Sequence, residues 1–281
     1  MSLTNALDGG ALWTSNNMDT ATIAASVGGS AALLPNYPAS NLNNPMRTKR
    51  FRATHPGGGS DMVTFTIVTP SVAVNAIAFV DWNLPESDKT FSLQTFSGVG
   101  TYLLYPYQGD HGVARYYLGT PSSGTWTSPT TVYTLTFQGD YSLPDSYMEI
   151  GEIYLGSYTN IDIATPANIG LQDSSTRAQS YGGQEYVEPM TRWTKVDFNL
   201  LPMTQANMYT MEQVVDAVGP GHVILDMHGS AASTDGASTA PSTLDKASTY
   251  YGRLRKGQLM KQQLKGANNN VIGLSFDEAR K

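Results

Sequence analysis

The chain has 281 residues, a formal net charge of −6, no cysteine and only 14% charged residues, against about 25% in ordinary globular domains. The acidic balance argues against a general nucleic-acid binder, which would show a basic domain, and the absence of cysteine excludes disulfides and thiolate chemistry. No run approaches the roughly 18 apolar residues of a membrane-spanning helix, so we expect no membrane insertion. The polar opening MSLTNALDGGALWTSNN has no signal-peptide pattern, and we expect a protein of the cytoplasm or of a particle assembled there.

Turn-forming residues and a group of cations precede the first regular strand. Residues 1–35 are rich in Ala, Gly, Ser, Thr and Asn, which predicts an N-terminal arm or peripheral strands. The segment YPASNLNNPMRTKRFR then bends at its Asn and Pro residues and carries a cation cluster formed by Arg47, Lys49, Arg50 and Arg52. On an extended chain, Arg50 and Arg52 face one way while Lys49 and Phe51 face the other.

Short alternating segments from residue 60 onward predict a β-sandwich. DMVTFTIVT places Val63, Phe65 and Ile67 on one face, and VAVNAIAFVDW is almost continuously apolar, as in a strand buried on both faces. Further strands are predicted at residues 90–96, 102–107, 114–118, 132–137 and 147–155. Pro, Gly, Asp and Asn punctuate the gaps. Residues 36–157 are therefore predicted to form a jelly-roll β-sandwich domain.

The last part of the chain, residues 158–281, predicts a smaller α+β domain. Two segments, 173–179 and 184–189, can pair across the turn SYGG. Further strands are predicted at residues 192–200, 222–228 and 248–254. Residues 229–247 are nearly all small and polar, which predicts a long loop that either reaches a neighbouring subunit or is a mobile tip.

One helix is expected within this second domain. Thr204 is a good N-cap, and Gly219-Pro-Gly221 ends the helical pattern sharply. The apolar stripe of the helix consists of Met208, Met211, Val215 and Val218.

No local pattern indicates catalytic or cofactor-binding chemistry. There is no G-x-S-x-G, and Gly57–Gly59 is not followed by the Lys-Ser or Lys-Thr of a phosphate-binding loop. A Ser-His-Asp triad is defined in space rather than in sequence and stays open. His222 and His228 would lie about 20 Å apart on an extended strand, so they do not complete a zinc site with Asp226.

Glycoside hydrolysis needs a pair of carboxylates, and the sequence singles out no pair. The candidates weighed are Asp81, Glu86, Glu149 and Glu152. Glu149 and Glu152 have opposite parity on a regular strand and would lie on opposite faces. We therefore expect no enzyme, and no catalytic, cofactor-binding or metal-binding residue.

The cation cluster supports two interpretations. It could recognise nucleic acid or an acidic partner surface, or it could pair with carboxylates of this chain or of an adjacent copy, at about 0–1 kcal/mol per exposed pair. Because the whole chain is acidic, we favour the second interpretation and expect no specific nucleic acid partner. Arg47, Lys49, Arg50 and Arg52 are accordingly the candidate subunit-contact residues.

The order of several degenerate motifs resembles that of virion proteins of tailed bacteriophages. YPASNLNNPMRTKRFR resembles a bend followed by a basic strand that enters a β-sandwich in those proteins, and VNAIAFVDWNL resembles their next apolar strand. YMEIGEIYLG resembles a later strand, and DSSTRAQSYGGQEY, RWTKVDFNLLP and MEQVVDAVG resemble a C-terminal passage that ends in a helix. The likeness covers about residues 36–225. Phe51 stands where an indole is common, and the loop 229–247 has no counterpart.

This resemblance implies a structural component of the phage tail, at the tail tip or baseplate. Such proteins combine a carbohydrate-binding-like jelly roll with a smaller α+β split-barrel domain similar to tail-tube and distal-tail proteins. The implied partners are further copies in a homo-oligomeric ring and other tail or baseplate proteins, and the implied location is the virion tail, assembled in the host cytoplasm.

Two alternatives stay open beside the virion protein. A glycan-binding host-attachment module is favoured by the jelly-roll pattern and by tyrosine-rich segments such as TYLLYPYQ and ARYYLG, since aromatic rings stack on sugars. Tyrosine is also a common sheet residue. A glycan-processing enzyme is the other alternative.

Overall fold

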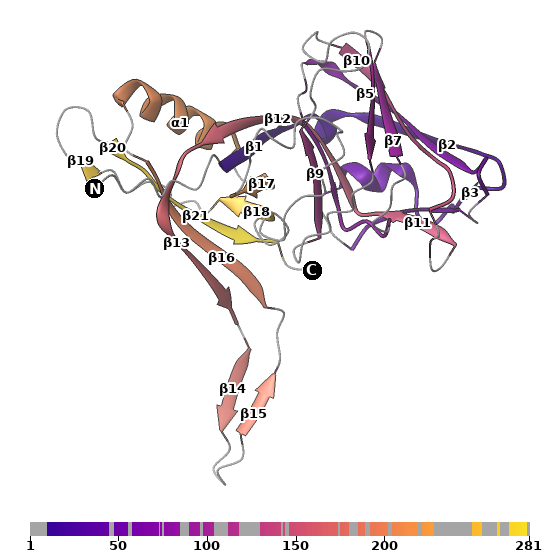
Figure 1. The fold of residues 1–281 in the computed structure, drawn as a ribbon. Coiled ribbons are helices and arrows are strands. Elements are labelled where there is room, and N and C mark those ends of the chain that lie inside the picture. The colour runs from indigo at the N-terminus through magenta and orange to yellow at the C-terminus, as the bar shows by residue number, and fades with distance from the viewer. Residues whose placement is uncertain are drawn as a thin grey trace.

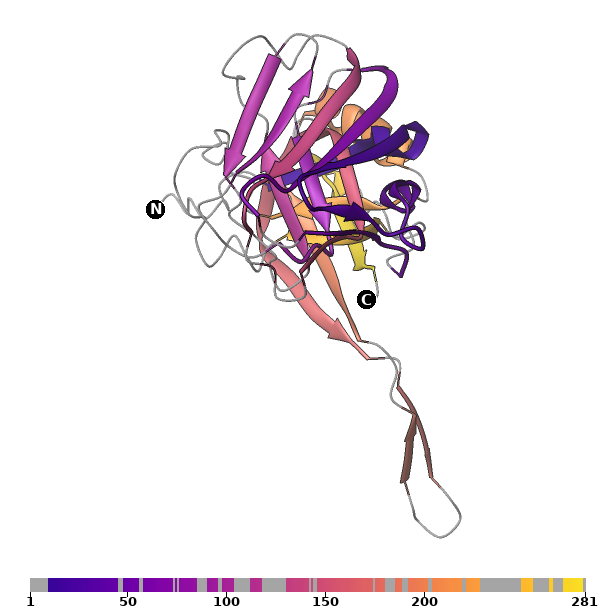
Figure 2. The ribbon, with the colours of Figure 1, turned by 90° about the vertical axis from the view of Figure 1, so that its right-hand side faces the viewer.

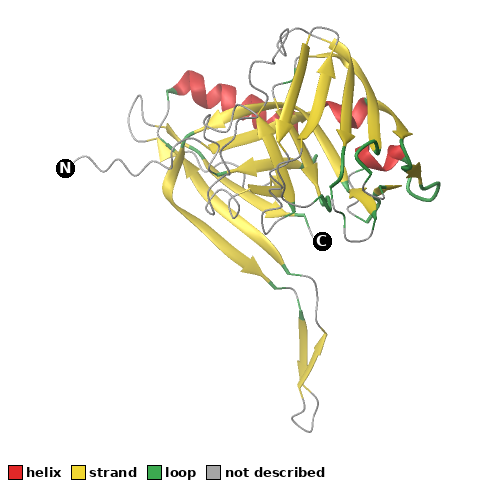
Figure 3. Ribbon diagram, turned by 45° about the vertical axis from the view of Figure 1, so that its right-hand side comes forward, coloured by secondary structure: helices red, strands yellow, loops and turns green. Residues whose placement is uncertain are grey.

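A continuous nine-stranded antiparallel sheet organises the molecule in the computed structural model (Figure 1). The structure describes residues 10–44, 48–55, 58–72, 74, 76–84, 90–95, 98–103, 112–117, 130–141, 143, 146–173, 175–179, 185–188, 192–201, 204–218, 221–227, 249–254, 263–264 and 270–279. Strands dominate these residues (Figure 3), so the predicted mainly β class is confirmed.

The large sheet joins strands from distant parts of the chain. In spatial order, its strands are β13 (Ile163–Gln172), β16 (Trp193–Leu200), β21 (Gly273–Glu278), β18 (Thr249–Leu254), β17 (Val223–Asp226), β1 (Gly10–Asn16), β12 (Glu152–Ile161), β6 (Ala76–Val80) and β9 (Val113–Tyr117).

Smaller sheets complete the β structure. The five-stranded sheet runs β2 (Thr22–Gly28), β5 (Met62–Val72), β10 (Thr130–Gln138), β7 (Thr90–Thr95) and β8 (Gly98–Leu103). The three-stranded sheet runs β11 (Tyr147–Ile150), β4 (Phe51–Thr54) and β3 (Ala32–Leu33). The remaining elements are the hairpin strands β14 (Thr176–Gln179), β15 (Glu185–Glu188), β19 (Gln263–Leu264) and β20 (Asn270–Val271), the 3₁₀ turns η1 (Asn17–Thr20) and η2 (Ala39–Asn43), and the helix α1 (Gln205–Val218).

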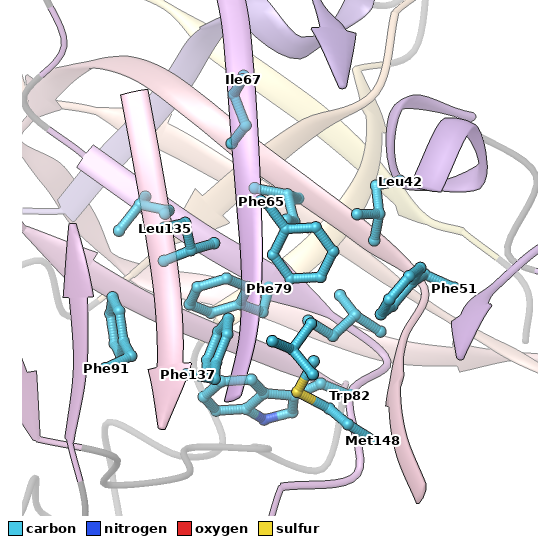
Figure 4. Close-up of a cluster of buried hydrophobic side chains, with 14 of the residues drawn as sticks. Leu42, Phe51, Phe65, Ile67, Phe79, Trp82, Phe91, Leu135, Phe137 and Met148 are labelled. Carbon is cyan, nitrogen blue, oxygen red and sulfur yellow. The ribbon is translucent and has the colours of Figure 1, made fainter. Parts of the chain in front are cut away.

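An aromatic core fills the space between the five-stranded sheet and one end of the large sheet (Figure 4). Val63, Phe65 and Ile67 alternate into it from β5 and are fully buried, as the sequence predicts. Phe79 stacks on Trp82 with ring centroids 4.7 Å apart and an interplanar angle of 3°. Two face-packed sheets of this kind form a β-sandwich, so the predicted β-sandwich is confirmed.

A second core lies where α1 packs on the opposite end of the large sheet. The helix buries the predicted stripe Met208, Met211, Val215 and Val218 against strands that include β16, β17 and β21. Its start is also as predicted, because the backbone N–H of Asn207 donates to the Thr204 hydroxyl at 3.3 Å. No helix among the described residues is long and apolar enough to cross a membrane.

The N-terminal segment differs from the predicted arm or peripheral strands. β2 and β3 are edge strands, but β1 lies inside the large sheet between β17 and β12. The short apolar run Ala11, Leu12, Trp13 is fully buried. A run of three apolar residues gives little sequence signal, and its pairing partners lie far along the chain.

The large sheet also crosses the predicted domain boundary. That boundary, between residues 157 and 158, falls within β12, and the sheet contains strands from both sides of it. The division into domains 36–157 and 158–281 stays a prediction, and the predicted loop 229–247 lies outside the described residues.

A β-ribbon projects from the body of the molecule. β13 and β16 run outward together, and β14 and β15 continue in the same direction to its far end (Figure 2). The predicted pairing of residues 173–179 with 184–189 is thus confirmed in β14 and β15, while the predicted turn SYGG lies outside the described residues.

Candidate functional site

Two of the predicted cations meet a carboxylate of the same chain. β4 pairs with β11 so that Arg52 lies opposite Glu149, and the alternation of an extended chain puts Arg50 on the same face. Arg50 Nη1 donates to Glu149 Oε1, and Arg52 Nε donates to Glu149 Oε2. The side chain of Glu149 is only 8% exposed, whereas those of Arg50 and Arg52 are 37% and 30% exposed.

Phe51 anchors these cations from the opposite face of β4. Its ring is buried and meets Phe65 edge-on, with centroids 4.8 Å apart. Sequence parity predicted that Phe51 faces away from Arg50 and Arg52, and the structure shows that Phe51 faces the core. Burial of Phe51 therefore fixes the direction in which Arg50 and Arg52 point.

The backbone around Glu149 is held by Asn83. Asn83 Oδ1 accepts from the Glu149 N–H at 2.7 Å, and the Glu149 carbonyl accepts from the Asn83 N–H at 3.1 Å. Asn83 Nδ2 also donates to the Tyr147 carbonyl at 2.9 Å. These bonds hold the backbone of β11 at the residue that carries the carboxylate.

Two tyrosines flank Arg52. The Arg52 guanidinium carbon lies 4.4 Å from the Tyr37 ring centroid and 5.0 Å from the Tyr147 ring centroid, within the range of cation–π attraction. Tyr37, Arg50, Arg52, Tyr147 and Glu149 together form what we call the Arg–Glu–Tyr cluster. The cluster is half-buried, charged and aromatic. It can fix the arrangement of its own side chains, or it can contact a polar partner.

The four predicted subunit-contact residues differ in their surroundings. Arg50 and Arg52 bind Glu149 within the chain, which is the intramolecular pairing that sequence reasoning allowed. Lys49 is exposed, and Arg47 lies outside the described residues. Contact with another subunit stays a prediction for all four.

Of the other weighed carboxylates, Glu152 is held by contacts within the chain. Glu152 is buried, its Oε2 accepts from the Tyr251 hydroxyl, and its Oε1 accepts from Asn16 Nδ2 at 3.3 Å. Asp81 is buried at a left-handed turn, with φ of 51°, and Glu86 lies outside the described residues. Glu149 and Glu152 thus both bind side chains of the same chain.

The strand HVILDMH differs from the predicted half-exposed face. Asp226 is fully buried and Thr249 Oγ1 donates to it at 3.5 Å. β17 is an inner strand of the large sheet. His222 lies just before β17 and stacks on Tyr251 at 5.0 Å. His228 lies outside the described residues, and the residues that the structure describes contain no group of three His, Asp or Glu side chains that could hold a metal ion.

The outer edge of the large sheet forms a second candidate site, which we call the β13 edge. β13 pairs with β16 on one side and, among the described strands, with none on the other. Its sequence, IATPANIGLQ, carries no charge. Ile169 and Leu171 are two residues apart and so lie on the same face of the strand. Their exposed fractions are 56% and 63%.

Sequence reasoning assigned no strand to residues 163–172. The Ile and Leu residues alternate there, which is the signal that could have found it, but Thr165-Pro166 interrupts the pattern. The structure shows a register shift at this place, between Ala164 and Asn168.

Comparison with known proteins gives distant structural likenesses only. No protein-family profile and no curated protein matches the chain. Chitosan-binding module 1 of a Paenibacillus sp. IK-5 chitosanase/glucanase is 15% identical over 51% of this chain and 100% of that chain, with a TM-score of 0.35. The family 32 carbohydrate-binding module of Clostridium perfringens NanJ, in complex with galactose, is 13% identical over 52% and 98%, also with a TM-score of 0.35. The mycobacterial arabinofuranosyltransferase AftD is 9% identical over 93% of this chain and 28% of that chain, with a TM-score of 0.30.

Proposed function

We propose that this chain is a non-catalytic structural protein of a bacteriophage tail, which assembles into a ring with further copies of itself and connects neighbouring tail or baseplate proteins. The observation that supports assembly is the β13 edge, and the tail location is proposed from the resemblance of the motif order. Open sheet edges with exposed apolar side chains pair readily with other chains, and proteins that stay monomeric protect them with charge, proline or short strands. The β13 edge is ten residues long. Pro166 and the register shift between Ala164 and Asn168 interrupt its first part, but residues 168–172 carry neither charge nor proline to keep another strand away.

The projecting ribbon supports the same proposal. A two-stranded ribbon is marginally stable in water by itself, because it buries little apolar surface. β14 and β15 pair with each other and with no third strand among those described. A ribbon that reaches away from its own core (Figure 1) gains stability when a neighbouring subunit covers it.

The polar chemistry of the described residues also fits a structural role. The carboxylates that sequence reasoning weighed for catalysis are, where described, buried or bound to side chains of the same chain. We infer that their role is to hold strands together, and that the low charge of the surface serves large contacts with neighbours.

Substitution of the β13 edge tests the proposal. The double variant Ile169→Lys/Leu171→Lys places two cations on the exposed apolar face, and light scattering after gel filtration measures the mass of wild type and variant. We expect wild type to assemble at micromolar concentration and the variant to stay monomeric. A matched control is Val68→Lys/Val132→Lys, which charges two exposed valines on the outer face of the five-stranded sheet and should leave assembly intact.

Glycan binding is the second candidate function, and the Arg–Glu–Tyr cluster is the observation that favours it. The half-exposed rings of Tyr37 and Tyr147 lie beside charged side chains that can bind sugar hydroxyls, and rings next to polar groups are suited to sugars. A glycan array probed with wild type and with Tyr37→Ala tests it. Binding that Tyr37→Ala abolishes would support the function, and an array without wild-type binding would remove it.

A further inference from the structure

The Arg–Glu–Tyr cluster carries more positive than negative charge. Arg50 and Arg52 are its two cations, and Glu149 is the carboxylate that both of them bind. Among the described residues, no other acceptor side chain binds either guanidinium. Two positive charges against one negative charge leave one positive charge of the cluster uncompensated within the described part of the chain.

Each arginine keeps unused hydrogen-bond donors. An arginine side chain has five N–H donors, and Glu149 binds one nitrogen of each, Nη1 of Arg50 and Nε of Arg52. Arg52 thus keeps both of its terminal nitrogens, and such a pair can bind a carboxylate through two parallel hydrogen bonds. The side chains of Arg50 and Arg52 are 37% and 30% exposed, so part of each is open to a ligand from solvent.

Hydrogen bonds tie the segment that carries Tyr37 to β4. The Arg52 N–H donates to the Tyr37 carbonyl at 3.3 Å, and the Arg52 carbonyl accepts from the Leu34 N–H, also at 3.3 Å. Asn41 Nδ2 donates to the Arg50 carbonyl at 2.8 Å. The backbone of both arginines is thus held within the chain, which lowers the conformational entropy that is lost when a ligand binds.

The two tyrosine rings add a surface that suits a sugar. Tyr37 and Tyr147 are half-buried, and their ring centroids lie 4.4 and 5.0 Å from the Arg52 guanidinium carbon. A sugar ring can pack on an aromatic ring while its hydroxyls bind polar groups nearby. Hydroxyls alone would leave the extra positive charge uncompensated, whereas a carboxylate on the same sugar would neutralise it.

We propose that the Arg–Glu–Tyr cluster binds a sugar that carries a carboxylate, with the carboxylate on the arginines and the sugar ring beside Tyr37 and Tyr147. This ligand class, which includes uronic and sialic acids, rests on the glycan-binding function given above as the second candidate. Both arginines already bind one carboxylate, that of Glu149. A long polyanion such as a nucleic acid fits less well, because the chain as a whole has a net charge of −6 and repels it.

Saturation-transfer NMR with matched sugars tests this ligand class on the wild-type protein. The probes are methyl glucuronide and the methyl glycoside of N-acetylneuraminic acid. Each is compared with its own methyl ester, which keeps the ring and the hydroxyls but removes the charge. We expect at least one acid to bind and its ester to bind at least about tenfold more weakly, because a hydrogen bond to a charged group contributes about that factor to affinity.

Substitutions locate the binding at the cluster. Arg52→Gln removes the terminal pair of nitrogens and should reduce binding of the acid to the level of the ester. Lys49→Gln is the matched control, because it removes an exposed cation of the same segment that lies outside the cluster, and it should leave binding of the acid unchanged. Circular dichroism checks that Arg52→Gln folds, and the comparison of acid with ester on wild type needs no variant.

The outcomes separate this ligand class from glycan binding as such. Equal binding of acid and ester would overturn the requirement for a carboxylate and leave glycan binding in place. Absence of binding by all four probes would also overturn it, and the glycan array then decides by itself whether the chain binds neutral glycans. Displacement of the acid by sodium acetate, or by a short oligonucleotide, at a lower concentration than the sugar itself would overturn it as well, because the site would then not select a sugar.

Discussion

Removing the charge of Glu149 tests whether the Arg–Glu–Tyr cluster stabilises the sandwich. The variant Glu149→Gln keeps the shape of the side chain. Its amide oxygen still accepts one arginine bond, but its NH₂ group then faces the donor of the other arginine. The variant thus loses one charge-assisted bond outright and weakens the second.

The expected magnitude follows from the burial of the three side chains. A hydrogen bond to a charged group contributes about 1.5–3 kcal/mol. Glu149 is 8% exposed, but Arg50 and Arg52 are 37% and 30% exposed, so water replaces part of what they lose. We therefore expect Glu149→Gln to lower the free energy of unfolding by about 2 kcal/mol, toward the lower part of that range.

Denaturant unfolding followed by circular dichroism measures this loss, with Lys49→Gln as the control. Lys49 is an exposed cation of the same segment, and its substitution should change stability by less than about 0.5 kcal/mol. A double-mutant cycle between Arg52→Gln and Glu149→Gln should give a coupling of about 1 kcal/mol. A loss below about 0.5 kcal/mol for Glu149→Gln would show that the cluster behaves as an ordinary surface ion pair and does not stabilise the sandwich.

The remaining predictions concern a close backbone contact and a buried carboxylate. Gly156→Ala should destabilise the protein by about 3 kcal/mol, because a Cβ there would lie 1.6 Å from the Ser15 carbonyl oxygen. Gly170→Ala, where a Cβ meets nothing within 4 Å, should be near neutral in the same unfolding assay, and equal losses would contradict the account. For Asp61→Asn, the stability difference from wild type should shrink in acid titrations as pH falls from 3.8 to about 2, since the pKa of Asp61 is lowered by its bonds to Ser30. A difference that stays constant over that range would show that Asp61 contributes nothing through its charge.

The parts of the fold that follow from local periodicity were predictable. The alternation of β5 placed Val63, Phe65 and Ile67 in the core, and the helical stripe of α1 faces the sheet. Both patterns depend on residues within one element, whose spacing reports directly which face is buried.

The arrangement of the large sheet was not predictable, because it depends on pairing between distant segments. β1 pairs with β12, and nothing in the short run GALW indicates that partner. β13 escaped detection because Thr165-Pro166 breaks its alternation. Pairings of this kind between distant strands join the two predicted domains in one sheet.

The candidate site was predictable only in part for the same reason. Parity correctly put Arg50 and Arg52 on one face of β4, but their partner Glu149 lies 99 and 97 residues further along the chain. Sequence reasoning weighed Glu149 as a catalytic carboxylate because spacing alone cannot show which cation a carboxylate meets.

The mass of the purified protein in solution, compared between wild type and Ile169→Lys/Leu171→Lys, tests the central claim most directly. We expect an assembled wild type and a folded monomeric variant whose circular dichroism spectrum matches that of wild type. A wild type that stays monomeric at high concentration, or a variant that assembles as well as wild type, would contradict assembly through the β13 edge.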